Sequence, residues 1–151
     1  MNWFAHAFSL WRILLLPFLF FHGQLIAGEV ADSDIEIYVN ASVPEKNYTL
    51  SEIRAIFAMR KTVWSDGSKI HVFVFPDNSP EHRQFTKSRL NMFPHQFRRI
   101  WDRLIFSGVG LAPVEVQSFE EMQEQLENTP GSIGYLYKPS HNGYIRKINY
   151  E

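Results

Sequence analysis

Residues 70–83 read IHVFVFPDNSPEHR, and they predict a buried strand that turns directly into a helix. Almost every position over residues 70–75 is apolar, so both faces of the strand are expected to be covered, as in a parallel or mixed sheet. Ser79 is the expected N-cap of the helix, Pro80 suits its first position, and Glu81 suits the positive end of its dipole. The stretch therefore predicts a strand-to-helix unit of an α/β domain.

The segment before this junction predicts a strand, a loop and a helix. Apolar and polar side chains alternate over residues 35–40, which indicates a strand, and residues 41–48 are a polar loop. Thr49 and Glu52 have the spacing of a capping box at the start of a helix. The end of that helix is expected near Lys61, because a cation suits the negative end of the dipole.

The remaining elements are predicted from apolar periodicity and turn residues. They are a turn over 64–67, a helix from 94 that ends at 107–110, a short strand over 114–116, a helix over 119–126, and strands over 133–137 and 144–150 joined by a turn at 141–143. Ser118 and Glu121 have the spacing of a second capping box. Alternating strands and helices predict α/β layering, and no repeat or linker divides residues 29–151, which are expected to form one domain.

Residues 1–28 differ from the rest of the chain. They hold one charged side chain, Arg12, then an apolar run over residues 13–21, and they end on Ala27-Gly28. A basic residue, a short apolar stretch and small residues are typical of a secretory signal peptide, and the run is shorter than the roughly 20 residues of a membrane span. We therefore expect export to the periplasm, with no stable membrane span after cleavage. An uncleaved N-terminal anchor is the alternative.

The composition argues against several classes of function. A formal net charge of −1 over 151 residues argues against a nucleic-acid binder, whose charge is normally strongly basic. The absence of cysteine excludes a disulfide framework, a thiolate zinc site and a cysteine nucleophile. The histidines lack metal-site spacing, and no G-x-S-x-G, H-E-x-x-H or phosphate-loop motif is present. We therefore expect no metal, no cofactor and no enzymatic activity.

The helix that begins at Ser79 is the best candidate for an anion site. Its first backbone N–H groups have no partner within the helix and carry about half a positive charge. Arg83 lies one turn further on, where it could form a bidentate pair with an oxyanion. Against this, Asp77 and Glu81 bring negative charge to the same place, and Pro80 removes a donor. Simple capping of the helix is therefore the alternative interpretation.

Six basic residues fall within two consecutive predicted helices: Arg83, Lys87, Arg89, Arg98, Arg99 and Arg103. Such a face could meet a nucleic acid, an anionic lipid or an acidic partner. The simpler interpretation is a solvated face. Its charge would then be offset by acidic residues of the next helix: Glu120, Glu121, Glu124 and Glu127.

Four ordered stretches resemble a known family. They are residues 48–57 and 63–67 (YTLSEIRAIF and VWSDG), residues 106–113 (FSGVGLAP) and residues 128–136 (NTPGSIGYL). Together they resemble the periplasmic phosphate-binding proteins of ABC transporters, and more closely their short single-domain relatives. The resemblance covers most of residues 35–140. It implies an α/β fold, namely a single three-layer lobe of a type II periplasmic-binding-protein-like fold with a mixed sheet.

The resemblance also implies ligand-binding residues, although the match is incomplete. In the family the phosphate loop after the buried strand carries an Arg and a Ser-Gly-Thr at a helix N-terminus. Here Ser79 stands at the place of that serine, while the Gly and the Thr are missing and the arginine lies a turn later. The family's late Thr-Pro-Gly turn lies near the cleft, although a Pro-Gly turn also needs no ligand. The implied ligand-binding residues are Asn78, Ser79, Arg83, Thr129, Gly131 and Ser132.

These observations lead to one expected function and one rival. The first is an exported solute-binding domain that binds phosphate or a similar small oxyanion in connection with ABC-type uptake. Because only about one lobe is present, a second lobe or an envelope protein is the expected partner that closes the site. The rival is a periplasmic accessory or interaction module that kept the lobe and lost the ligand.

Overall fold

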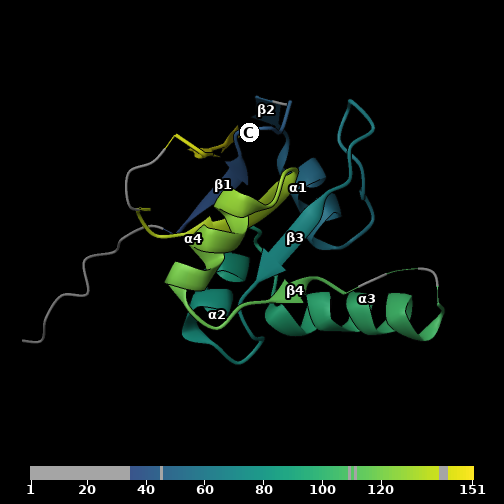
Figure 1. Cartoon of the computed structure of the whole chain (residues 1–151). Coiled ribbons are helices and arrows are strands. Elements are labelled where there is room, and N and C mark those ends of the chain that lie inside the picture. The colour runs from purple at the N-terminus through teal and green to yellow at the C-terminus, as the bar shows by residue number, and fades with distance from the viewer. Residues whose placement is uncertain (1–34, 45, 109, 111, 140–142) are drawn as a thin grey trace, which may run out of the picture. The chain divides into compact units, whose positions relative to one another are not determined.

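A computed structural model describes residues 35–151, apart from 45, 109, 111 and 140–142 (Figure 1). The expected signal peptide, residues 1–28, and most of the expected turn at 141–143 lie outside the described residues. In the described part, the elements in chain order are β1 (Glu36–Asn40), β2 (Asn47–Tyr48), α1 (Leu50–Phe57), β3 (His71–Val74), α2 (Pro80–Ser88), α3 (Pro94–Phe106), β4 (Val114–Glu115), α4 (Phe119–Asn128), β5 (Ser132–Leu136), β6 (Ile145–Lys147) and β7 (Asn149–Tyr150).

The main sheet is mixed, as the sequence predicts. Its strand order is β4-β3-β5-β1-β6. β3 pairs in parallel with both β4 and β5, whereas β1 pairs antiparallel with β5 and β6. β3, the strand before the helix junction, is therefore an interior strand, which explains why Val72, Phe73 and Val74 are all buried.

Helices cover both faces of this sheet, which gives the expected three layers. On β5, a side chain at Gly134 would meet Met122 of α4, so this residue faces α4. The next residue, Tyr135, points to the other face, where its ring stacks on Phe85 of α2 at 3.7 Å and lies 6.1 Å from Phe57 of α1. One core on each side of the sheet follows from the two-residue period of the strand.

Local sequence signals set the helix starts. Thr49 and Glu52 form the expected reciprocal capping box. At α4, Ser118 accepts a hydrogen bond from Glu121 N–H, but the carboxylate of Glu121 accepts its bond from Gln117 N–H, so the second box is only half formed.

Helix α1 ends earlier than its expected end near Lys61. Its last residue is Phe57, and Met59 takes a left-handed conformation (φ 57°). Met59 packs against the core in that position. The N–H groups of Arg60 and Lys61 bond back to Ala55 O, so the chain has already left the helix four residues before the expected end at Lys61.

The expected strand over 144–150 divides into two. β6 pairs with β1, and β7 leaves the main sheet to pair in parallel with β2, which lies in the expected polar loop over 41–48. Between them, Ile148 is buried and donates its N–H to Ile37 O. The β2–β7 pair joins residues about 100 positions apart, so the sequence around either strand alone does not predict the pairing.

None of the helices in the described part of the chain combines the length and apolar character that a membrane crossing requires.

Candidate functional site

The junction of β3 and α2 has the geometry that the sequence predicts. Ser79 is the N-cap of α2, and its Oγ accepts a hydrogen bond from His82 N–H at 3.0 Å, with Pro80 at the first helical position. The arrow of β3 runs toward α2 in Figure 1, so the N-terminus of α2 lies at the carboxyl edge of the sheet. Ligands of open α/β sheets bind at this edge.

A hollow of about 340 Å³ opens between the N-termini of α2 and α4. Its walls are Phe75, Pro76, Ser79, Glu81, Gln117, Ser118, Phe119 and Glu120. Both N-cap serines, one from each helix, belong to this wall. Two helix starts therefore bring the partial positive charge of their N-termini to one space, while the cap serines and Glu120 already accept several of the N–H groups.

Two carboxylates also line the hollow. Glu120 accepts hydrogen bonds from its own backbone N–H and from the Ser118 hydroxyl, and these bonds lower its pKa. Glu81 lies in the first turn of α2. A negative side chain thus already neutralises the start of α4, so a fully deprotonated anion meets repulsion there.

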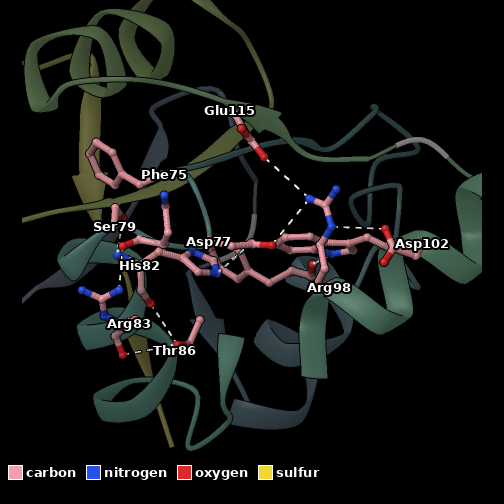
Figure 2. Close-up of polar contacts among 12 residues, drawn as sticks. Phe75, Asp77, Ser79, His82, Arg83, Thr86, Arg98, Asp102 and Glu115 are labelled. Atoms are coloured by element: carbon pink, nitrogen blue, oxygen red, sulfur yellow. Dashed lines mark hydrogen bonds and ion pairs between the residues drawn. The ribbon is translucent and has the colours of Figure 1, made fainter. Parts of the chain in front are cut away.

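Asn78, Ser79 and Arg83 are brought together at the start of α2, and Figure 2 shows Ser79 and Arg83 there. Arg83 Nη1 donates to the backbone carbonyl of Asn78 at 2.6 Å, and both residues are exposed. Arg83 therefore holds the loop before the helix, and a ligand would have to share or replace this bond.

Thr129, Gly131 and Ser132 lie elsewhere, at the start of β5. Ser132 pairs with His71, the first residue of β3, so these three lie at the amino edge of the sheet, opposite Ser79. With about 3.3 Å per strand residue, the length of β3 separates the two groups. One small ligand cannot contact both, so the six implied residues do not form one site.

The residues at the amino edge have structural partners. Gly131 N–H donates to Ser42 Oγ, and Gly131 O accepts from the buried Trp64 indole at 2.9 Å. The Ser132 hydroxyl, fully buried, donates to Leu126 O at 3.0 Å. This turn ties β5 to α4 and to the Trp64 turn. These bonds agree with the interpretation that the Pro-Gly turn is structural and needs no ligand.

A buried polar pair lies behind the start of α2. The Tyr135 hydroxyl accepts from Phe75 N–H at 2.9 Å and lies 2.7 Å from His82 Nδ1. Burial raises the pKa of Tyr135 and lowers the pKa of His82 to about 4. The Tyr135 hydroxyl therefore donates a hydrogen bond to Nδ1 of the neutral His82 ring, and the ring proton lies on Nε2. This pair fixes the end of β3 against α2.

Asp77 faces away from the hollow. Its Oδ1 lies 3.7 Å from His82 Nε2, and its Oδ2 lies 3.5 Å from Arg98 Nη1 on α3 (Figure 2). Burial raises the pKa of Asp77, and Arg98 opposes that effect. Of the two carboxylates expected to oppose an anion, Glu81 lines the hollow and Asp77 does not.

Two arginines of the basic cluster, Arg89 and Arg98, form ion pairs with acids outside α4. Arg98 contacts Asp102 at 3.1 Å and Glu115 at 3.8 Å as well as Asp77, and Arg89 contacts Glu36 at 3.1 Å. The acids that contact Arg98 therefore come from α3, from β4 and from the loop before α2, because α3 packs beside α2 and α4 covers the other face of the sheet.

A second hollow, of about 230 Å³, shares the lining residues Phe119 and Glu120 with the first. Its other walls are Gln123, Leu136, Tyr137, Lys138 and Pro139. The sequence alone did not mark these residues as part of a site. Tyr137, Lys138 and Pro139 follow β5 directly. Because β5 runs parallel to β3, both strands end at the same edge of the sheet, and this rule could have placed the residues after β5 there.

Within the described residues, no group of three His, Asp or Glu side chains is arranged to hold a metal ion.

No protein-family model matches the chain, and no curated protein matches it by sequence. Several solved structures match it by their fold. An ABC-type phosphate transport receptor from Vibrio cholerae matches with a TM-score of 0.56 and 17% identity, over 77% of this chain and 45% of that protein. PstS from Borrelia burgdorferi matches with a TM-score of 0.51 and 18% identity, over 68% and 39%.

A third solved structure is a putative phosphate ABC transporter substrate-binding protein from Clostridium perfringens with bound phosphate. It has a TM-score of 0.58 and 14% identity, over 77% of this chain and 44% of that protein. The chain thus spans less than half of the length of each of these proteins. At such identities the likeness concerns the fold. The described part of the chain therefore has the type II periplasmic-binding-protein-like fold of the phosphate-binding proteins, as an α/β lobe with a mixed sheet.

Proposed function

We propose that this chain is a non-enzymatic, exported solute-binding domain that binds phosphate or a similar small oxyanion. The site is the hollow between the starts of α2 and α4. The observation that carries the proposal is the convergence of two helix N-termini, capped by Ser79 and Ser118, on one space at the carboxyl edge of the sheet. Of the implied residues, Ser79 lines this hollow, Asn78 and Arg83 lie beside it at the start of α2, and Thr129, Gly131 and Ser132 lie at the opposite edge of the sheet.

The two carboxylates of the hollow favour a protonated anion. Phosphate carries at least one proton near neutral pH and can donate it to Glu81 or Glu120, whereas sulfate has no proton to donate. Phosphate should therefore bind better than sulfate. The fold of the structural neighbours and the signal-like residues 1–28 support a place in ABC-type uptake outside the cytoplasm.

The site is open on one side, so its affinity should be modest until a partner covers it. The structural neighbours are more than twice as long as the matched region, so a second lobe or an envelope protein is the partner proposed here.

Calorimetry on the full chain with phosphate and with sulfate tests the proposal. The informative variant is Ser79→Asp, because aspartate is also a good N-cap and keeps the helix, while its charge enters the hollow. Ser51→Asp adds the same charge to the exposed start of α1 and is the matched control. We expect phosphate binding by the wild type and Ser51→Asp and its loss in Ser79→Asp. Absence of heat and of a thermal shift at millimolar phosphate in the wild type would refute it.

The rival function, an interaction module without a ligand, is supported by the groups that already occupy the site. Glu120 neutralises the start of α4, and Arg83 is bonded to the Asn78 carbonyl. Arg99 and Arg103 expose cations on α3 that could meet an acidic partner. Under this rival, Arg99→Glu with Arg103→Glu abolishes capture of a defined envelope partner, and phosphate gives no heat.

A further inference from the structure

A separate hollow of about 600 Å³ lies at the amino edge of the sheet, opposite the start of α2. The chain after α1, the residues directly before β3 and the end of α3 form its walls. Its lining residues include Met59, Arg60, Thr62, Lys69, Ile70 and Leu104. The volume falls in the range of small-molecule sites, roughly 300–1,000 Å³. The hollow shares no residue with the proposed anion site.

The floor of this hollow is apolar. Ile70 is buried beneath it, and Met59 packs against the core while part of its surface stays open. Leu104 of α3 is half-buried, and beyond it α3 exposes Ile105 and Phe106. The apolar stripe of α3 therefore continues past the part of the helix that the core covers. Such a surface gains free energy when an apolar group covers it.

The charged side chains of the hollow are both cations. Arg60 and Lys69 line it, no carboxylate belongs to its described walls, and neither cation forms an ion pair with a described residue. Glu52 and Asp66, the acids nearest to them in the chain, bond to other side chains. An anionic group therefore meets two unpaired positive charges here, with no carboxylate on the wall to oppose it.

The walls select one chemical class of ligand. An apolar floor with a cationic rim fits a molecule that has an apolar body and an anionic head. Arg60 and Lys69 only donate hydrogen bonds, so the side chains of the wall suit a head that only accepts them. A peptide fits less well, because its backbone N–H groups need acceptors.

From this arrangement we propose that the hollow binds a long-chain fatty acid. Its carboxylate pairs with Arg60 and Lys69, and its hydrocarbon chain covers Met59, Ile70 and Leu104. This site goes beyond the proposed function, since it takes a different ligand at the opposite edge of the sheet.

Calorimetry on the full chain at pH 8 with laurate, held below its micelle concentration, tests the inference. Butyrate has the same head without the long chain, and dodecyltrimethylammonium has a chain of the same length with the opposite charge. We expect laurate to bind about tenfold or more tightly than either, because its affinity needs both the ion pairs and the covered apolar surface.

Two variants on adjacent residues show where laurate binds, which matters because the apolar residues 13–21 could also attract a hydrocarbon chain. Thr62→Trp fills the hollow from an exposed position, so the fold should tolerate it, and laurate binding should weaken tenfold or more. Val63→Trp adds the same bulk at a half-exposed residue outside the hollow and is the matched control. It should leave laurate binding unchanged.

Two double variants test the cations. Arg60→Ala with Lys69→Ala should weaken laurate binding about tenfold, because both ion pairs are lost. Arg99→Ala with Arg103→Ala removes the same charge from exposed positions of α3 that do not line the hollow, and it should have little effect.

Three results would overturn the inference. The first is no measurable binding of laurate by the wild type, and the second is laurate binding that Thr62→Trp leaves intact. The third is equal affinity for laurate and dodecyltrimethylammonium, because the cations would then play no part. None of these results bears on the anion site between α2 and α4, which is tested separately with phosphate.

Discussion

Acidification should destabilise this protein through His82. The ring is 1% exposed, its Nδ1 accepts from the Tyr135 hydroxyl, and its Nε2 has no hydrogen-bond partner among the described residues. Burial therefore favours the neutral ring, and it lowers the pKa of His82 from 6.5 to about 4. Between these two pKa values the unfolded chain binds a proton that the folded chain does not, so the free energy of unfolding falls as the pH falls.

The size of the effect follows from the two pKa values. Each pH unit between them is worth about 1.4 kcal/mol, so the loss is about 2 kcal/mol from pH 7 to pH 5 and about 3 kcal/mol when the pH falls below 4. Asp77 acts in the opposite direction at the lower end, because burial raises its pKa and the folded chain then takes up a proton first. The interval from pH 7 to pH 5 is therefore the cleanest one for His82.

Urea unfolding of the full chain at pH 7 and pH 5, in the wild type and in His82→Gln, measures this effect. A glutamine amide can accept from Tyr135 and donate toward Asp77, but it does not titrate. The wild type should lose about 2 kcal/mol more than His82→Gln over this interval. His95→Gln, on an exposed ring of α3, should behave as the wild type does.

Equal losses in the wild type and His82→Gln would refute the reasoning. They would mean that the ring is hydrated or already charged in the folded protein, in contradiction to its burial and to the bond from Tyr135.

Three further substitutions test bonds and packing at the two edges of the sheet, each by thermal and urea unfolding. Tyr135→Phe leaves Phe75 N–H buried without an acceptor and should lower the free energy of unfolding by about 1–3 kcal/mol. A decrease well below the lower end of this range would contradict the bond. Gly131→Ala places a Cβ against the Lys69 carbonyl at a φ of +73° and should cost about 2 kcal/mol or more, whereas a neutral result would mean that the turn relaxes. Ser79→Ala removes the cap of α2 and should cost about 1 kcal/mol, with an unchanged melting temperature as the contrary outcome.

Elements marked by local chemistry could be predicted from the sequence. The helix starts at Thr49 and Ser79 depend on side chains within three residues of the cap, and both have the expected bonds. The two-sided burial of β3 follows from its composition. The prediction was wrong where the structure depends on distant partners, as in the split of the last strand between β1 and β2, and the sequence did not indicate which acids contact Arg98.

The separation of the six implied residues has a simple topological cause. β3 and β5 run in parallel, so whatever precedes β5 must lie at the edge opposite to whatever follows β3. A turn before a strand and a loop after its parallel neighbour can therefore never share a small ligand, however well each matches a motif. By the same rule the residues that follow β5, Tyr137 and Lys138, must lie at the edge where α2 begins. The oxyanion of this lobe should therefore be sought through the residues that follow its parallel strands.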